Sequence, residues 1–526
     1  MALIKKKKIE YYLNEAKTRK GDIRGIYNQI LDLTDPFSRI SDTGVIDFSS
    51  RREIDSSVTE AIDALKSFIM SSLFPRTGNW ADIYIDEDKL IETAGEEIKP
   101  QLESIKKNKG ADLDKVFKYL QSSNYYKEIS RAVDSFIKVG TGCYCIRETG
   151  STTKPFIFSY IGLDNLYILE DSLSRPNIVF KLHSDCNSEY LYDLFGKDIT
   201  LPSTLDTSTL DSKIEVYEIV IPEYNEETTM TDYNYMVMTS DLGTLLKEEQ
   251  LSYNPFVVFR WGSIEGNPWG KSIVTDSLGL LIELEEYKEI YKIQARRIGN
   301  PSAMFTGNRA LFDSLTLEEG TITFAGDNFK EGQQGDLRYL STGSNLMPLD
   351  KLIAESRLAF KRKLMVDSLI MNVEQGKNTT ATYVQYMQEM FRKRFSDTYE
   401  SINFELLSPT FLAPFTIMLK NRMLQLNPDI IPYANITYIN ELSKATDMGD
   451  VNGLLQYTQI ISGLNQAQGA GVILDAPKAN TWIATKMGIN KELLPTEEEL
   501  RTIQQIRMQQ QQQQLQQQQG EVIPNE

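Results

Sequence analysis

Apolar residues recur at helical spacing in the first part of the chain. The clearest stripe consists of Val58, Ile62, Leu65 and Ile69. Residues three or four positions apart share one face of a helix, so the stripe predicts a buried helical face. We expect helical structure from Ile9 to about Phe74, where Pro75 stops it. A further helix is predicted from Ala111 to Val139.

Between about 143 and 260 the pattern changes to short β-rich runs separated by Pro, Asn, Asp and Ser. The runs are 157–161, 178–182 and 213–221. Runs of this length and composition are typical of strands. This block therefore predicts an α+β domain with an antiparallel sheet.

From about 270 the pattern is mainly helical again. Leu280, Leu284, Tyr287 and Tyr291 form an apolar stripe on a charged segment that Asn300-Pro301 ends. Glutamates lie early in this segment and basic residues late, which complements the helix dipole and offers Glu-to-Lys pairs. Residues 300–341 are Gly-rich with a strand-like run at 321–324, and a second helix is predicted from Pro348 to Leu369.

The rest of the chain is predicted to be helical apart from one polar loop. The segment 372–380 is polar, and a helix from Thr382 to Leu407 follows it, with Thr382 and Gln385 fitting a capping box. We expect helices past 420 to about Thr502. Residues 504–519 are almost entirely glutamine, which predicts either a fraying helix or a disordered tail.

Charge and composition limit the function classes. The chain has 526 residues, 41% of them hydrophobic, with a formal net charge of -17. It is long enough for several structural units, and its acidity argues against a protein that coats nucleic acid. The Lys5–Lys8 patch has no apolar run behind it, so we expect no signal peptide, and no run is long enough for a membrane span. We expect a protein made in a reducing cytoplasm.

Candidate catalytic and metal-binding residues are few. The cysteines are Cys143, Cys145 and Cys186, and His183 is the only histidine. A zinc site of these four residues would match no standard spacing, so we interpret the C-x-C pair as buried strand residues and expect neither a metal nor another cofactor. Residues 266–272 end in Gly-Lys-Ser, but Glu265 stands where a phosphate-binding loop needs glycine. We predict no ATP hydrolysis and no catalytic residues.

One motif lies where the β-rich block meets the first long helix of the second half. It consists of Arg260, Glu265, Trp269, Gly270, Lys271 and Ser272, in the pattern R-x-x-x-x-E-x-x-[WY]-G-[RK]-S. This motif, followed by a Leu/Glu-rich helix, resembles the segment before the stem helix in head-to-tail connector (portal) proteins of T7-like, short-tailed bacteriophages. The resemblance extends to 72–75 with Trp80, to 382–407, to 436–464 and to the glutamine-rich tail.

The resemblance implies a mainly helical α+β portal fold with wing, stem, clip and crown regions. On this sequence the regions would be a wing domain (1–262), stem helix 1 (263–300), a clip (301–346), stem helix 2 (347–370), a channel loop (371–381), a long wing helix (382–430), a crown-like helical region (431–503) and the Gln-rich tail (504–526).

The resemblance also implies a homododecameric ring at one capsid vertex of the virion, assembled in the host cytoplasm. DNA would pass through it during packaging by a terminase motor and during ejection through the tail. The other partners implied are the major capsid protein and scaffold, tail adaptor proteins and internal core proteins, with no membrane.

Two sets of residues are the candidate contacts to DNA. The channel loop would contribute Glu374, Gln375, Gly376, Lys377, Asn378 and Thr379. A basic collar behind the loop would contribute Lys361, Lys363, Arg392 and Lys393, which lie in two basic triplets on either side of it. Successive helical residues diverge by about 100°, so at most one or two of each triplet can face a channel. The alternative for the triplets is two solvated or ion-paired helix faces.

Two other functions stay open at this point. The first is a structural or scaffolding virion protein that forms a ring without conducting DNA. The second is a metal-dependent nuclease that uses acidic clusters such as 86–88, although such clusters in an acidic chain are usually solvated.

Overall fold

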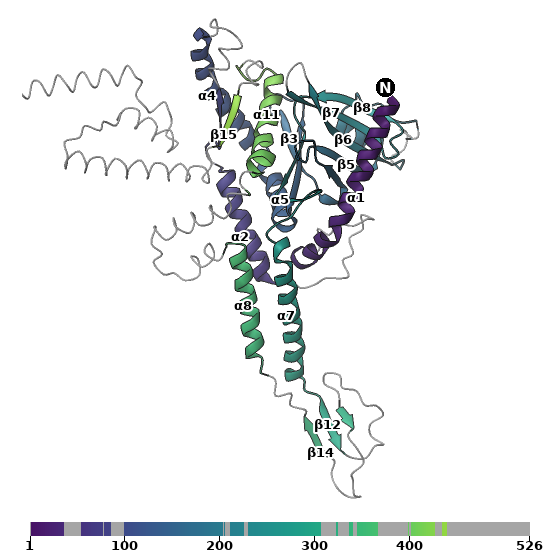
Figure 1. Cartoon of the computed structure of the whole chain (residues 1–526), viewed down its shortest axis with the longest axis vertical. Helices are drawn as coiled ribbons and strands as arrows, with labels where there is room; N and C mark the ends of the chain where they lie inside the picture. The colour runs from purple at the N-terminus through teal and green to yellow at the C-terminus, as the bar shows by residue number, and fades with distance from the viewer. Residues whose placement is uncertain are drawn as a thin grey trace, which may run out of the picture. The chain divides into compact units, whose positions relative to one another are not determined.

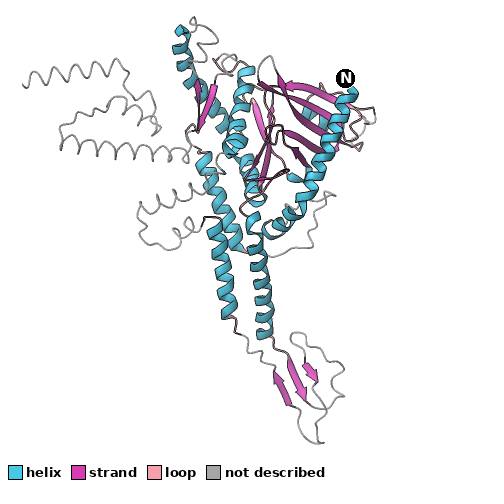
Figure 2. Cartoon of the chain, viewed as in Figure 1, coloured by secondary structure: helices cyan, strands magenta, loops and turns pink. Residues whose placement is uncertain are grey.

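The computed structural model describes residues 2–35, 54–76, 78–85, 99–203, 205, 211–225, 230–306, 322–324, 336–339, 345–366, 398, 401–426 and 434–438. The chain divides into two compact units. One contains residues 1–70 and 87–433, and the other contains residues 71–86 and 434–526. The first unit contains both helices and sheets, with the strands in consecutive runs along the chain, as Figure 2 shows. The coarse prediction of an α+β fold is confirmed.

The helices of the described part are α1 (Ala2–Thr34), α2 (Ser56–Leu73), α4 (Lys99–Ser122), α5 (Tyr125–Val139), α6 (Ser188–Phe195), α7 (Leu278–Gly299), α8 (Met347–Lys363) and α11 (Ser408–Lys420), and all but α6 are labelled in Figure 1. Short 3-10 turns occur at η4 (Leu163–Asn165) and η5 (Thr275–Ser277), and a π-helical turn, η7 (Asn403–Leu407), leads directly into α11.

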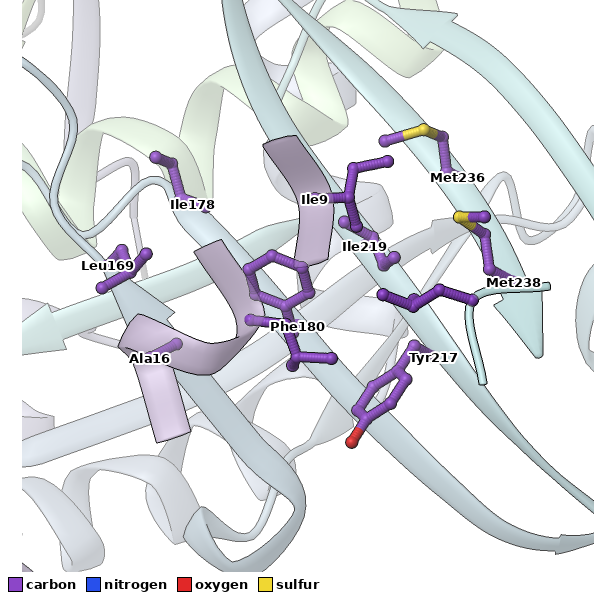
Figure 3. Packing of buried hydrophobic residues seen from close by; sticks show 11 residues of the cluster. Ile9, Ala16, Leu169, Ile178, Phe180, Tyr217, Ile219, Met236 and Met238 are labelled. Atoms are coloured by element: carbon purple, nitrogen blue, oxygen red, sulfur yellow. The ribbon is translucent and has the colours of Figure 1, made fainter. Parts of the chain in front are cut away.

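The largest sheet has five antiparallel strands in the order β4-β5-β6-β7-β8. Their bounds are β4 (Leu166–Leu169), β5 (Ile178–Cys186), β6 (Ile214–Asn225), β7 (Met230–Thr239) and β8 (Leu245–Leu251). Side chains alternate between the faces of a strand. On one face Phe180, Ile219 and Met236 pack against Ile9 and Ala16 of α1, as Figure 3 shows.

A second sheet of three antiparallel strands has β2 in its centre. It is made of β3 (Phe156–Tyr160), β2 (Thr141–Glu148) and β9 (Phe256–Arg260), and α5 packs on it. Arg147 of β2 connects it to the five-stranded sheet, because its Nη2 lies 2.7 Å from Oε2 of Glu218 in β6. The two sheets thus meet at a buried ion pair.

The remaining strands form three small sheets. A hairpin pairs β10 (Ser263–Ile264) with β11 (Asn267–Gly270). Between α7 and α8 in sequence, β12 (Ala303–Thr306) pairs in parallel with β13 (Ile322–Phe324) and antiparallel with β14 (Asp336–Tyr339). In the second unit, β1 (Ala81–Ile85) pairs antiparallel with β15 (Ala434–Tyr438).

Helices α7 and α8 run side by side as an antiparallel pair (Figure 1). The buried residues of α7 are Leu281 and Leu284. Our predicted stripe was therefore wrong by one position at its start, since Leu280 is only half-buried, as are Tyr287 and Tyr291. The buried residues of α8 are Ile353, Ser356 and Phe360.

Several predicted boundaries are corrected. Residues 263–277 form a hairpin and a 3-10 turn, so the first long helix begins at Leu278 and not at 263. The second ends at Lys363 and not at Leu369. The helix predicted for 111–139 is two helices, interrupted at Ser123-Asn124, where the Asn124 side chain bonds the backbone of Phe158. Residues 434–438, predicted to be helical, form a strand because β1 supplies a partner.

Other predictions agree with the structure. The end of α2 at Leu73, the strand at 322–324 and the three β-rich runs are confirmed. The C-x-C pair lies in buried strand β2, as interpreted, and all three cysteines are free thiols. The loop at 371–381, the start of the helix at Thr382, residues 439–502 and the glutamine tract all lie outside the described residues.

Candidate functional site at the turn into helix α7

The motif at 260–272 forms the connection from the sheet to α7. Arg260 is the last residue of β9, the β10–β11 hairpin follows, and η5 then leads into the helix. A chain that changes from strand to helix within a few residues exposes backbone groups that need partners. The side chains of the motif supply several of them.

Arg260 is buried and binds two carboxylates. Its Nη2 lies 2.6 Å from Oε1 of Glu405 in η7, and its Nη1 lies 2.5 Å from Oε1 of Glu170. Nη2 also donates to the carbonyl of Ser174 at 2.9 Å, and the backbone N–H of Arg260 donates to Glu405 at 2.8 Å. Arginine suits this position because its planar fork can satisfy several acceptors at once.

The guanidinium of Arg260 is held in its charged state, whereas burial raises the pKa of Glu405 above its usual value. Burial disfavours the guanidinium charge, but the hydrogen bonds and charges of Glu405 and Glu170 outweigh burial and hold the pKa of Arg260 above its ordinary value. Removing one member of such a cluster leaves a buried charge without compensation. Arg260 therefore joins three elements of the first unit: β9, the segment after β4, and the π-helical turn before α11.

Trp269 and Gly270 fix the hairpin against α1. The indole of Trp269 is fully buried and meets the ring of Tyr27 edge-on, with centroids 6.0 Å apart. The Tyr27 hydroxyl donates to the carbonyl of Gly270, while the N–H of Gly270 donates to Oγ1 of Thr141 at 2.9 Å. Burial raises the pKa of Tyr27, so its hydroxyl remains protonated and available as a donor.

Two glycines allow the backbone of the turn to touch the end of α5. A Cβ on Gly270 would lie 2.2 Å from the carbonyl oxygen of Gly140, a distance that no side chain tolerates. Gly140 itself ends α5 with φ of 91°, in the left-handed region that favours glycine. A Cβ there would lie 2.4 Å from the backbone carbon of Lys271. The close approach thus requires glycine on both sides.

Ser272 closes the turn. Its hydroxyl donates to the carbonyl of Lys138 at 2.9 Å and accepts from the N–H groups of Val274 at 3.1 Å and Thr275 at 3.0 Å. These are bonds of the capping kind that serine favours at helix starts. The side chains of Glu265 and Lys271, in contrast, are exposed. Four of the six motif residues therefore build the turn, and two present charge to solvent.

A second polar junction connects α7 and α8 to the start of α2. Asp55 is nearly buried and caps α2 by accepting from the N–H of Ser57 at 2.9 Å. The same carboxylate lies 3.1 Å from Nζ of Lys288 in α7 and 2.8 Å from Nη2 of Arg357 in α8. Burial opposes the charge, but these partners outweigh burial and hold the pKa of Asp55 well below its usual range. Lys288, which lies at helical spacing from glutamates of α7, thus forms an ion pair with Asp55 of another element.

The predicted basic collar is described only in part. Lys361 lies 3.6 Å from Oε2 of Glu60, and Lys363 donates to the carbonyl of Asp276. Lys361 therefore has an ion-pair partner within the chain, and Lys363 has a backbone acceptor. Arg392 and Lys393 lie outside the described residues, as do all six channel-loop candidates, Glu374, Gln375, Gly376, Lys377, Asn378 and Thr379.

His183 belongs to a buried polar network. Its Nε2 lies 2.9 Å from Oε2 of Glu218, and its Nδ1 lies 3.2 Å from the hydroxyl of Tyr190. Tyr235 donates to the other oxygen of Glu218 at 2.9 Å. Burial lowers the pKa of His183 despite the neighbouring carboxylate. In the described part of the chain, no group of three or more His, Cys, Asp and Glu residues is placed to hold a metal ion.

Sequence analysis did not identify the distant residues that contact and stabilise the turn. These are Tyr27, Gly140, Thr141, Glu170 and Glu405, which lie far from the motif in sequence. Only the Gly140-Thr141-Gly142 run carried a signal, since two glycines at the start of a strand indicate an unusually close backbone approach.

The described helices include none that is both long and apolar enough to cross a membrane.

Comparison with known proteins identifies the family to which this chain belongs. Residues 6–494 match the family described as bacteriophage head to tail connecting protein. The portal protein of Salmonella phage epsilon15 is 21% identical over 536 aligned positions, covering 96% of this chain and 92% of the relative. A chain of the virion of a native gene transfer agent particle is similar over 81% of this chain and 89% of its own length, at 8% identity and a TM-score of 0.34. The chain therefore belongs to the bacteriophage head-to-tail connecting proteins, the portal proteins of short-tailed phages.

Proposed function

We propose that this chain is one subunit of a closed ring of about twelve copies at one vertex of the capsid. A ring of this kind forms when one heterologous contact between neighbouring copies repeats until it closes. Double-stranded DNA enters through the ring during packaging and leaves through it during ejection. The observation that carries the proposal is the family match over residues 6–494. The antiparallel pair α7–α8, anchored at Arg260 and Asp55, supports it as a candidate stem.

We infer the same regions, in the same order and with the same bounds, as the resemblance implies. The wing comprises residues 1–262, and the stem helices are α7 and α8 within 263–300 and 347–370. The clip comprises 301–346, where β12, β13 and β14 lie. The channel loop (371–381) follows, then a wing region (382–430) in which helix α11 ends at Lys420, the crown (431–503) and the tail (504–526).

The ring acts with other phage proteins and not as an enzyme. A terminase supplies the motor, the major capsid protein and scaffold surround the ring in the host cytoplasm, and tail adaptors dock on the clip. The acidity of the chain supports a conduit, because a wall that binds phosphates weakly lets DNA slide.

Disrupting the gene in the phage distinguishes a ring that conducts DNA from a ring that has only a structural role in the particle. A conduit predicts capsids whose DNA content, measured as nuclease-resistant DNA per particle, falls to background. Complementation with the wild-type chain should restore packaging. Capsids that protect a full genome without this protein would overturn the proposal and favour a purely structural role.

A further inference from the structure

Helix α1 begins with a basic surface in a chain that is otherwise acidic. The exposed charged side chains described in its first half are Lys7, Lys8, Glu10 and Lys17, whereas the whole chain has a formal net charge of -17. Lys8 lies over the ring of Tyr12, 5.6 Å from its centroid. Among the described residues, no carboxylate pairs with Lys7 or Lys8. Packing of the subunit therefore does not account for this positive surface.

The lysines are not placed to stabilise the helix. A helix start favours acidic residues, because the helix dipole is positive there, and the first turn of α1 contains no acidic residue. Lysines at this end oppose the dipole. An anion bound beside them, in contrast, is attracted by the dipole and by the lysines together. The arrangement is therefore unfavourable in the free subunit and becomes favourable when a polyanion is bound.

The exposed face of α1 carries further side chains that bond phosphate. Lys7, Tyr11 and Asn14 are exposed and fall within about 60° of one another at about 100° per residue. The stripe extends over about 10 Å of helix, a length along which one strand of duplex DNA presents about three phosphates. Lysine, tyrosine and asparagine are among the side chains through which proteins contact these phosphates. The opposite face of α1 is buried on the five-stranded sheet, as Figure 3 shows.

This chemistry favours DNA over two other polyanions. A membrane surface would need exposed apolar side chains beside the lysines, but the apolar face of α1 is buried. An acidic protein would be matched best by arginines, which bind carboxylates bidentately, and by several apolar anchors. Here the exposed cations are lysines, which bind phosphate as point charges, and Tyr11 is the large exposed hydrophobic side chain.

We propose that the start of α1 binds the phosphate backbone of double-stranded DNA through Lys7 and Lys8, with Tyr11 and Asn14 donating hydrogen bonds beside them. The contact carries no base specificity, because it is made to phosphates. It is a second contact to DNA besides the proposed channel loop. Because it concerns the surface of one subunit, it goes beyond the proposed function and does not require a ring.

A closed circular duplex distinguishes this surface from a channel, because a closed circle cannot thread a closed ring. Purified wild-type protein should retain the circle on a filter, with an affinity that falls as salt rises. Lys7→Glu/Lys8→Glu should lower this affinity at least about tenfold. It should also reduce the slope of log K against log salt by about two, since two phosphate contacts are lost. Wild-type protein that binds linear DNA but not the circle would overturn the inference.

Two further variants control for net charge and for folding. Lys154→Glu/Lys197→Glu changes the net charge equally at exposed lysines elsewhere in the first unit and should bind the circle as wild type does. Lys7→Arg/Lys8→Arg keeps the charge and should retain binding. Glutamate near a helix start complements the dipole, so Lys7→Glu/Lys8→Glu should keep the wild-type melting temperature. Equal losses of affinity in both glutamate variants would show an effect of net charge alone and overturn the inference.

Polyglutamate tests the acidic-protein alternative. It should displace the circle less well than unlabelled duplex DNA does at equal charge concentration. Displacement as strong as that by DNA would indicate an acidic protein partner and overturn the inference. Such a failure would leave the proposed function standing, because that function is tested separately by the DNA content of capsids.

Discussion

Arg260 is the residue on which the turn depends most, because one guanidinium compensates two carboxylates. In Arg260→Met, Glu405 is left buried without a cation, which costs about 3–5 kcal/mol of stability. Chemical denaturation should detect this as a lower midpoint. Lys271→Met, an exposed change in the same motif, should stay within about 0.5 kcal/mol of wild type.

A double variant separates the charge from packing. Arg260→Met/Glu405→Leu removes both partners and should recover part of the loss, since apolar replacements of a buried pair are often tolerated. A double variant as unstable as the sum of its single changes would contradict the assignment of Arg260 and Glu405 as an ion pair.

Asp55 makes a pH-dependent contribution. The pKa of Asp55 is lower in the folded chain than in the unfolded chain, so its stabilisation is complete above about pH 4 and is lost as pH falls through the folded pKa. Asp55→Asn, which can still cap α2, should lower stability by about 1–3 kcal/mol at pH 7. Thermal melts of both proteins should converge as the pH falls below 4. A constant difference down to low pH would show that the carboxylate charge is not responsible.

At the scale of elements, the approach of the β10–β11 hairpin to the end of α5 depends on glycine. Gly270→Ala puts a Cβ 2.2 Å from the Gly140 carbonyl, so the backbones must separate, at a cost of about 2 kcal/mol or more. Gly279→Ala is the matched control, because nothing lies within 4 Å of that Cβ in α7. There alanine should raise stability by up to about 1 kcal/mol. Equal effects of the two changes on the melting temperature would contradict the close approach.

Hydrophobic periodicity predicted the helices and strands that are determined by the local residue pattern. The stripe at 58–69 and the stop at Pro75 define α2, and the β-rich runs became strands because alternation reflects burial on one face. Boundaries set by distant partners were not predictable. Residues 434–438 are a strand because β1 pairs with them, and 263–270 form a hairpin whose backbone Tyr27 and Thr141 bind.

The site was predictable to a similar extent. Sequence located the motif at 260–272 and its place before a long helix. It could not show that Glu405 and Glu170 meet Arg260, because neither lies near the motif in sequence. Nor could it show that Lys288, placed at helical spacing from glutamates, also bonds Asp55.

At the scale of the whole molecule, the channel loop carries a prediction about DNA. Lys377→Glu should leave ring assembly unchanged and impair packaging or retention of DNA, because it reverses a charge proposed to face phosphates. Nuclease-resistant DNA per particle and infectivity are the readouts. Lys154→Glu, an exposed change on the wing, is the control. Wild-type infectivity of Lys377→Glu would rule out this role for the loop.

Electron microscopy of the purified protein tests the central claim most directly. The account predicts closed rings of about twelve-fold symmetry in axial views, with a central hole wide enough for duplex DNA, since one heterologous contact repeats until it closes. Monomers, dimers or sheets without a hole across a range of salt concentrations would contradict it.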